Sequence, residues 1–246
     1  MTDDAIILVP ARMGSSRLPG KPLADIAGAP MIVHVLRRAR EADAGPVLVA
    51  AAEEAIAEAV QAAGGEVVLT DPDLPSGSDR IAAALAVHDP RRRYGIVVNL
   101  QGDLPTIEPA DIRRCVEALR GTGADIATLA AEIRDPEEAA NPNVVKAIAP
   151  LDQEPVALAQ DFVRELPEGA EGPVFHHVGI YAYRRPALER FVSLPPSKRE
   201  RERKLEQMRA LDNGMTIAVA RVEHAPFGVD APEDLERVRA ILGNGA

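Results

Sequence analysis

The stretch AIILVPARMGSSRLPGKPL, residues 5–23, joins an apolar run to a loop that carries three cations among glycines, serines and prolines. The apolar run has the length and the β-branched content of a buried strand. In open α/β sheets, ligands bind at the carboxyl ends of the strands, where such a loop lies. The elements around this strand therefore indicate the fold, and the cations indicate the kind of ligand.

Short apolar runs alternate with longer amphipathic segments over the first 133 residues. The predicted strands are AIILVP (5–10), PVLVA (46–50), EVVLT (66–70), GIVVNL (95–100) and DIATLAAEI (125–133). The predicted helices are MIVHVLRRAREA (31–42), EEAIAEAVQAA (53–63), SDRIAAALAVH (78–88) and PADIRRCVEALRG (109–121). Continuous apolar strands between helices predict an α/β fold, in which a doubly wound, mostly parallel sheet is covered on both faces.

The alternation is less regular after residue 150. We expect strands at HHVGIYAYR (176–184) and MTIAVARVE (215–223), one charged helix at SKRERERKLEQMRAL (197–211) and a closing helix at PEDLERVRAIL (232–242). The sequence contains no internal repeat and no low-complexity tract. We therefore expect a single domain over residues 1–246, with a less regular part at about 150–215.

Composition excludes several classes of protein. A chain of 246 residues with 46% hydrophobic content can bury one sizeable core. Its formal charge of −10 and its 3% aromatic content disfavour a protein that coats nucleic acid. Cys115 is the only cysteine, so no intrachain disulfide is expected, and no run reads as a membrane span or a secretory signal. The expectation is a cytoplasmic protein without nucleic-acid or membrane partners.

The loop at residues 10–23, called the cationic loop below, fits neither of two common phosphate-binding patterns. The pattern GxxxxGK[ST] fails because five residues separate Gly14 from Gly20 and Pro22 replaces the hydroxyl residue. The dinucleotide pattern GxGxxG is absent as well, which disfavours an NAD-dependent dehydrogenase.

The cations of this loop nevertheless suit a polyphosphate. Arg12, Arg17 and Lys21 lie among glycines whose backbone amides can bind an anion. The alternative is a surface turn with solvated cations. Three cations directly after the first strand of an acidic protein favour the phosphate-binding interpretation.

Two aspartates indicate a metal ion beside the phosphates. Asp103 follows the predicted strand at 95–100, which places it at the sheet edge where the cationic loop begins. Alone, Asp103 is typical of a turn, and Asp230 with Pro232 and Glu233 has the composition of a helix N-cap and capping box. Together with three cations, the two carboxylates favour a bound magnesium ion, which takes a few carboxylates and completes its shell with phosphate oxygens and water.

Seven motifs occur in the order expected for one enzyme family: PARMGSSRLPGKPL, LPSGSDR, VNLQGDLP, NPNVVK, HHVGIYAYR, LEQMR and GVDAPEDLERV. By these motifs, which span essentially the whole chain, the sequence resembles the 3-deoxy-manno-octulosonate (Kdo) cytidylyltransferases. The first motif is shared with cytidylyltransferases that activate sialic acids, whereas HHVGIYAYR and LEQMR point to Kdo.

The resemblance implies an activity and its setting. A fold of nucleotidyltransferase (nucleotide-diphospho-sugar transferase) type would transfer CMP from CTP to the anomeric hydroxyl of Kdo. The products would be pyrophosphate and CMP-Kdo, which serves lipopolysaccharide biosynthesis. Mg²⁺ would be the cofactor, and the protein would be a homodimer with part of its interface at about residues 185–215.

The resemblance also implies roles for individual residues. The CTP phosphates would be bound by Arg12, Arg17 and Lys21, and Mg²⁺ by Asp103 and Asp230. Of these, Arg12, Lys21, Asp103 and Asp230 are the expected catalytic residues. Cytosine and ribose would be recognised by backbone groups near Pro10 and Ala11 and by Ser76, Arg80 and Gln101.

On the sugar side, Arg164 would bind the Kdo carboxylate. The sugar hydroxyls would be contacted by Gln101, His177, Tyr181, Glu206 and Gln207. Structural alternatives remain for these residues: a strand histidine and tyrosine can be ordinary buried residues, and the two helix residues can belong to a solvated face.

The chain departs from the family pattern at three places. Leu104 in QGDLP replaces an acidic residue, AAAEE (50–54) lacks an aspartate after the second strand, and QDFVRELP (160–167) lacks a serine-arginine pairing. These departures leave two alternatives open. One is a cytidylyltransferase for another acidic sugar, such as 8-amino-Kdo or a sialic acid, and the other is a CTP-binding protein that has lost catalysis.

Overall fold

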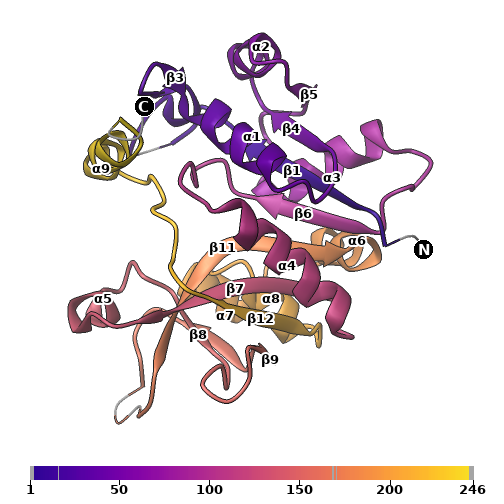
Figure 1. Cartoon of the computed structure of the whole chain (residues 1–246). Coiled ribbons are helices and arrows are strands. Elements are labelled where there is room, and N and C mark those ends of the chain that lie inside the picture. The colour runs from indigo at the N-terminus through magenta and orange to yellow at the C-terminus, as the bar shows by residue number, and fades with distance from the viewer. Residues whose placement is uncertain (1–2, 16, 168, 170, 244–246) are drawn as a thin grey trace. The chain divides into compact units, whose positions relative to one another are not determined.

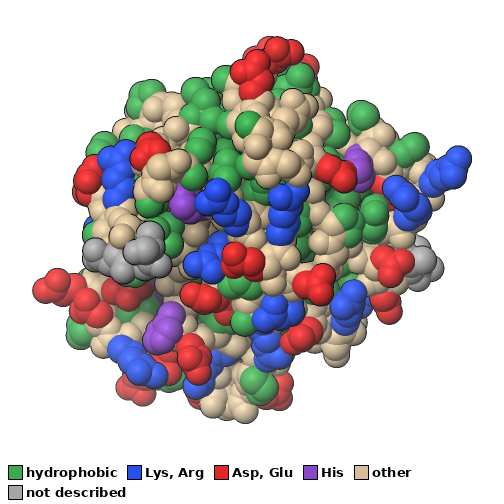
Figure 2. All heavy atoms as spheres, turned by 45° about the horizontal axis from the view of Figure 1, so that its top comes forward, with side chains coloured by type: hydrophobic (Ala, Val, Ile, Leu, Met, Phe, Trp, Pro, Cys, Tyr) green, Lys and Arg blue, Asp and Glu red, His purple; other side chains and the backbone are tan. Residues whose placement is uncertain are grey.

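The computed structural model describes residues 3–15, 17–167, 169 and 171–243. The chain forms two compact units, of which the first comprises residues 1–113 and 226–246 and the second residues 114–225. In the described part of the chain, every helix is too short or too polar to cross a membrane. On the face shown in Figure 2, Lys and Arg side chains are interspersed with Asp and Glu side chains.

The first unit contains a four-stranded parallel sheet. Its strands, in spatial order, are β5 (Glu66–Leu69), β4 (Val47–Ala51), β1 (Ala5–Ala11) and β6 (Ile96–Leu100). The register places Leu8 of β1 between Leu48 of β4 and Asn99 of β6. Every residue of β1, β4 and β6 is buried, as expected for strands that are covered on both faces.

Three crossover helices connect these strands: α1 (Met31–Glu41), α2 (Glu54–Ala62) and α3 (Gly77–His88). The chain moves outward from β1 to β4 and β5, and then crosses back to β6 (Figure 1). Right-handed crossovers therefore place α1 and α2 on one face of the sheet and α3 on the other. The strand order reverses between β1 and β6, where this class of fold binds its ligands. The predicted α/β class is confirmed.

A small apolar cluster fixes the remaining elements of the first unit, which are η1 (Lys21–Leu23), β2 (Asp25–Ile26), β3 (Ala29–Pro30) and α9 (Pro232–Gly243). Its buried members come from both ends of the chain: Ile26, Met31, Val229, Leu235 and Val238. Leu18 of the cationic loop packs against this cluster. The cluster therefore holds the segment before α9 close to the loop that follows β1.

The second unit has a mixed sheet, reached through α4 (Pro109–Gly121). Its strands are β7 (Ile126–Ile133), β8 (Lys146–Ile148), β9 (Val156–Leu158), β10 (Asp161–Val163), β11 (Val174–Arg184) and β12 (Ile217–Val222). Strand β7 runs parallel to β12 and antiparallel to β11, whereas β8 pairs antiparallel with β10 and β11, and β9 with β12. Its helices are α5 (Pro136–Ala140), α6 (Arg185–Ser193), α7 (Lys198–Arg203) and α8 (Met208–Asp212).

A bulge interrupts the pairing of β11 with β7. Val178 pairs with Leu129, but the next pair along β7 joins Thr128 to Tyr181. The two residues between, Gly179 and Ile180, have no partner on β7 in this register.

The single helix predicted over residues 197–211 is wrong. The structure has two short helices, α7 and α8, because Lys204 takes a left-handed conformation (φ 55°) that ends α7. A capping box formed by Ser197 and Glu200 begins α7. Charge-rich composition predicts a continuous solvated helix, but Glu200 is buried rather than solvated.

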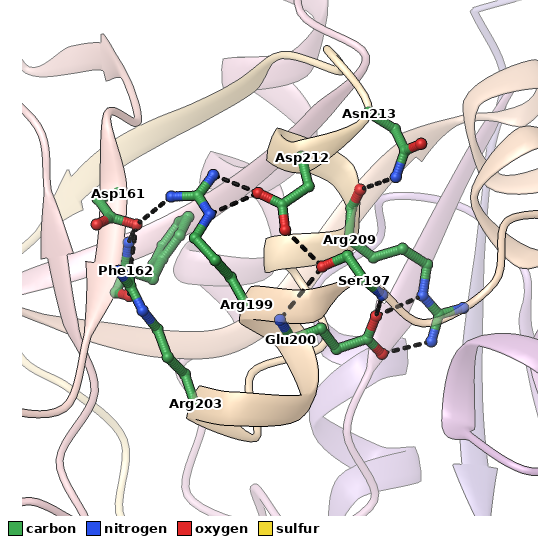
Figure 3. Close-up of polar contacts among 9 residues, drawn as sticks. All are labelled: Asp161, Phe162, Ser197, Arg199, Glu200, Arg203, Arg209, Asp212 and Asn213. Atoms are coloured by element: carbon green, nitrogen blue, oxygen red, sulfur yellow. Dashed lines mark hydrogen bonds and ion pairs between the residues drawn. The ribbon is translucent and has the colours of Figure 1, made fainter.

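Polar contacts join α7 and α8 to β10 (Figure 3). Arg199 and Arg203 form ion pairs with Asp161 at 3.3 and 2.7 Å. The carboxylate of Glu200 accepts two hydrogen bonds from Arg209, at 2.6 and 2.9 Å, in a geometry that shields both side chains from water. Residues 204–207, between the two helices, are therefore held from both sides.

We expect this buried pair to stabilise the second unit strongly. Glu200→Ala leaves the buried guanidinium of Arg209 without its main partner, and should lower the free energy of unfolding by about 3 kcal/mol. Glu202→Ala in the same helix removes an exposed pair with Lys198 and should change it by less than about 1 kcal/mol. Urea unfolding measures both free energies, and equal effects of the two substitutions would contradict a stabilising role for the buried pair.

Candidate active site

A pocket of about 350 Å³ lies in the first unit at the carboxyl ends of β1 and β6. It is lined by the cationic loop, by residues 74–80 at the start of α3 and by residues 101–103 after β6. The residues predicted to bind the nucleotide all line it: Pro10, Ala11, Arg12, Arg17, Lys21, Ser76, Arg80 and Gln101. The fold brings together predicted residues as far apart in the sequence as Pro10 and Gln101, because parallel strands end at one edge of the sheet.

The chain itself fixes the base of the cationic loop. The backbone N–H of Met13 donates to Glu53 Oε2 at 3.0 Å, and the carbonyl of Met13 accepts from Gly20 N at 3.3 Å. Gly20 has a φ of 72°, which favours glycine. Sequence reasoning missed Glu53, although AAAEE, in which it stands, was the place where an expected aspartate was lacking. Its carboxylate supplies an acidic group one position further on.

Arg12 and Arg80 contribute positive charge to the same pocket. Arg12 is exposed, and in the described part of the chain no hydrogen bond or ion pair engages its guanidinium. Burial lowers the pKa of Arg80, and the nearby charge of Arg12 lowers it further. The two charges therefore act on one another across the pocket, and an anion placed between them would relieve that repulsion.

Lys21 lies between the two aspartates predicted to bind metal. Its Nζ is 2.7 Å from Asp103 Oδ2, 2.9 Å from the carbonyl oxygen of Val229 and 3.4 Å from Asp230 Oδ1. Arg17 reaches the other oxygen of Asp230 at 3.2 Å. Two of the cations predicted to bind phosphates and the two carboxylates predicted to bind metal thus form one charge cluster.

At the start of α9, a capping contact is made by Asp234, a residue of the first turn, rather than by Asp230. The Asp234 carboxylate accepts hydrogen bonds from the backbone N–H groups of Asp230 and Ala231, each at 3.0 Å. The Asp230 carboxylate is directed instead at Arg17 and Lys21. Composition alone favoured the cap, whereas the geometry leaves this carboxylate to the charge cluster.

These carboxylates have the chemistry that magnesium requires. Asp103 and Asp230 are hard oxygen donors that already converge on a single cationic atom, Lys21 Nζ. Within the described ranges, no group of three or more His, Cys, Asp or Glu residues could hold a metal ion by itself. Two carboxylates that share an ion with substrate phosphates are a common arrangement for Mg²⁺.

Two of the predicted nucleoside-binding residues also hold the pocket wall in shape. The buried guanidinium of Arg80 donates to Thr70 Oγ1 at 2.6 Å and to the carbonyls of Asp71 and Pro72 at 3.0 and 3.2 Å. Ser76 is the N-cap of α3, where its hydroxyl accepts from Asp79 N at 3.2 Å. Arg80 therefore orders the loop before α3 while one side of it faces the pocket.

The turn after β6 is sterically demanding. A Cβ at Gly102 would lie 2.8 Å from the carbonyl oxygen of Pro10, so the turn can approach β1 only because residue 102 is glycine. Gln101 Nε2 donates to Oδ1 of the buried Asn99 at 3.2 Å, which orients the Gln101 amide. Asn99 is a second residue that sequence reasoning missed, because a buried strand asparagine carries no motif of its own.

The predicted sugar-binding residues other than Gln101 lie in the second unit. The ring of His177 contacts the rings of Phe162 and Tyr181, with centroid distances of 5.0 and 5.5 Å. Burial lowers the pKa of His177 to about 3, and the nearby charge of His176 adds to this. Burial raises the pKa of Tyr181, and the charges of Tyr183 and Glu206 raise it further. His177 and Tyr181 are therefore both neutral at pH 7.

Within the protein, the guanidinium of Arg164 donates to backbone carbonyls. Its Nε, Nη1 and Nη2 donate to the carbonyls of Arg203, Pro142 and Lys204 at 2.9, 3.1 and 3.3 Å. These bonds hold Arg164 beside residues 203–204, and only Leu205 separates this pair from Glu206 and the buried Gln207. The structure thus brings Arg164 toward the same segment of chain as two other predicted sugar-binding residues.

The α/β fold, with a pocket lined by cations at the carboxyl ends of β1 and β6, is typical of nucleotide-binding proteins. A family model described as cytidylyltransferase matches residues 6–217. The 3-deoxy-manno-octulosonate cytidylyltransferase of Parvibaculum lavamentivorans is 58% identical over 96% of this chain and 92% of its own length. The 3-deoxy-manno-octulosonate cytidylyltransferase of Rhodospirillum centenum is 60% identical over 96% of this chain and 93% of its own length. The solved structure of a CMP:2-keto-3-deoxy-manno-octonic acid synthetase complexed with CTP superimposes with a TM-score of 0.89 at 39% identity, covering 98% of this chain and 99% of the other.

The chain therefore belongs to the cytidylyltransferase family, a family of nucleotidyltransferases. Within that family it belongs with the 3-deoxy-manno-octulosonate cytidylyltransferases, as the motifs predicted.

We expect Arg12 to be a main determinant of CTP affinity. Arg12→Ala removes a charge that has no protein partner in the described chain, and should weaken CTP binding at least about tenfold, the effect of one charge-assisted hydrogen bond. Arg37→Ala, an exposed arginine of α1 in the same unit, should leave the affinity unchanged. Isothermal titration calorimetry measures both, and equal affinities would contradict the role of Arg12.

Proposed function

We propose that this chain transfers CMP from CTP to the anomeric hydroxyl of Kdo and releases pyrophosphate. The observation that carries the proposal is the charge cluster at the pocket, in which Arg17 and Lys21 meet Asp103 and Asp230. Relatives at 58% and 60% identity carry the name of this activity. The product, CMP-Kdo, is the activated sugar used in lipopolysaccharide biosynthesis.

The reaction is a phosphoryl transfer in which one bond forms and one breaks. The sugar hydroxyl oxygen attacks the α-phosphorus of CTP, the bond from that phosphorus to the bridging oxygen breaks, and the hydroxyl proton passes to water. Pyrophosphate leaves with the electrons of the broken bond. Positioning and charge neutralisation are the main requirements of such a step. Arg12, Arg17 and Lys21 would bind the phosphates and stabilise the charge that develops on pyrophosphate.

Asp103 and Asp230 would hold Mg²⁺, with substrate oxygens and water completing its shell. When bound, the ion supplies positive charge to the phosphates and lowers the pKa of a hydroxyl that coordinates it. Lys21 would then leave the carboxylates for the phosphates, because Lys21 and Asp103 line the same pocket. Leu104, which replaces an acidic residue beside Asp103, is buried and leaves both carboxylates in place.

Sugar recognition is proposed for the second unit. His177, Tyr181, Glu206 and Gln207 would contact hydroxyls of the sugar. Arg164 would bind the Kdo carboxylate through the N–H groups that its three backbone contacts leave over, since a guanidinium carries five.

The setting of the enzyme is part of the proposal. Residues 1–246 would act as one cytidylyltransferase domain, with the part at about 150–215 serving sugar binding and dimerisation. The protein would be a cytoplasmic homodimer that acts on CTP and Kdo without nucleic-acid or membrane partners.

The test is pyrophosphate release by the purified protein with CTP and Mg²⁺, comparing Kdo, 8-amino-Kdo, N-acetylneuraminate and no sugar. Release that requires Kdo and stops when the metal is chelated is the expected result. Release with only another sugar would identify a cytidylyltransferase for that sugar, with the same reaction and a different substrate. CTP binding without release in any mixture would identify a nucleotide-binding protein that lacks catalysis.

The two carboxylates should be essential to this activity. Asp103→Asn and Asp230→Asn each remove one charge from the metal site, and each should lower kcat about 100-fold or more with an unchanged fold. Asp43→Asn, at an exposed position of the same unit, is the matched control and should keep full activity. Wild-type turnover in either site variant, with circular dichroism confirming the fold, would refute the two-carboxylate metal site.

A further inference from the structure

Thr128 of β7 is fully buried opposite the bulge of β11. Its Oγ1 lies 2.7 Å from the carbonyl oxygen of Ile180, 3.1 Å from that of Val178 and 3.0 Å from His177 Nε2. One hydroxyl thus contacts both ends of the bulge and the imidazole of a predicted sugar-binding residue. Sequence reasoning assigned no role to Thr128.

The number of protons available decides how these contacts are made. A threonine hydroxyl has one proton, and a carbonyl can only accept. The Thr128 hydroxyl therefore donates its proton to the carbonyl of Ile180, the shorter of the two contacts. The carbonyl of Val178 lies beside this hydrogen bond. The contact with His177 is then attractive only if Nε2 carries a proton and donates it to Oγ1.

A neutral imidazole carries its proton on one nitrogen only. Because burial keeps His177 neutral, a proton on Nε2 leaves Nδ1 as an acceptor. Among the residues that the structure describes, none forms a hydrogen bond with Nδ1. This nitrogen therefore suits a ligand group that donates, such as a hydroxyl.

The bulge also brings His177 close to Tyr181. Four residues along a regular strand span about 13 Å. Here His177 pairs with Ala130 and Tyr181 with Thr128, so the two side chains occupy neighbouring positions on one face of the sheet. Their ring centroids are 5.5 Å apart. The Thr128 hydroxyl satisfies carbonyls of the bulge that makes this approach possible.

We propose that Thr128 is a positioning residue for sugar recognition, whose hydroxyl closes the bulge of β11 and holds His177 as the Nε2–H tautomer. Nδ1 of His177 then accepts a hydrogen bond from a sugar hydroxyl. The inference rests on the proposed function, because it takes His177 and Tyr181 as sugar-contacting residues.

The first test reads the tautomer without substrate. In protein with ¹⁵N-labelled histidine, long-range ¹H–¹⁵N correlations distinguish the two tautomers, and His177→Gln identifies the His177 signals. The expected result at pH 7 is Nε2–H in the wild type and in Thr128→Ser, and loss of this preference in Thr128→Val. A wild-type Nδ1–H tautomer overturns the proposal.

The second test reads the effect on each substrate separately. Thr128→Val preserves shape but removes the hydroxyl, and should raise the KM for Kdo about tenfold with an unchanged KM for CTP. Thr128→Ser should restore the KM for Kdo to within about threefold of the wild type. Thr122→Val, which removes a hydroxyl bonded to the carbonyl of Ala118 in α4, is the matched control. An unchanged KM for Kdo in Thr128→Val overturns the proposal.

The two tests separate failure of the inference from failure of the proposed function. Absence of pyrophosphate release by the wild type with every sugar overturns the proposed function, and with it the sugar-positioning role. The tautomer is decided by the spectrum in either case. If Thr128→Val does not fold, the test relies on Thr128→Ser, which keeps the hydroxyl. A mixed or Nδ1–H tautomer of His177 in that variant overturns the role of the hydroxyl.

Discussion

The reversal of strand order between β1 and β6 is the constraint on which the site depends. Parallel strands end at one edge of a sheet, so the loop after β1 and the turn after β6 must meet where the crossovers diverge. The glycine at position 102 allows the closest approach, since any side chain there would collide with the carbonyl of Pro10. The pocket follows from this topology, and the loop sequences then determine its charge.

That charge is balanced locally in a protein that is acidic as a whole. Lys21 and Arg17 are paired with Asp103 and Asp230, and Glu53 binds the backbone at the base of the loop. Arg17 and Lys21 therefore add little uncompensated repulsion before a nucleotide arrives, whereas the charges of Arg12 and Arg80 still oppose one another. A triphosphate with its metal would exchange partners within this cluster, with its phosphates meeting the cations and its metal meeting the carboxylates.

Much of this could be predicted from the sequence, for identifiable reasons. Buried parallel strands such as β1 and β6 are continuous apolar runs, and α1 shows its buried face through the spacing of Met31, Val35 and Ala39. The predictions that failed concerned features that depend on contacts between residues distant in the sequence. The burial of Glu200 reflects its pairing with Arg209, and α7 ends at the left-handed conformation of Lys204; charge-rich composition conceals both features. Similarly, Asp234 rather than Asp230 receives the N–H groups before α9, although both fit the local pattern. Asn99 and Thr128 are uncharged residues within strands, where a polar role shows only in three dimensions.

The first unit is discontinuous, since residues 114–225 are inserted between its two segments. As a chain emerges from the ribosome, β1, β4 and β6 are available early, but Asp230 and the apolar residues of α9 are made more than 100 residues later. The second unit has its own strands and can fold in the interval. Residues 226–243 then pack against the first segment and so close a long loop. The entropic cost of closing such a loop grows only slowly with its length. The anionic half of the charge cluster is therefore completed last, so that an unfinished chain holds the cations of the pocket without the full set of carboxylates that balances them.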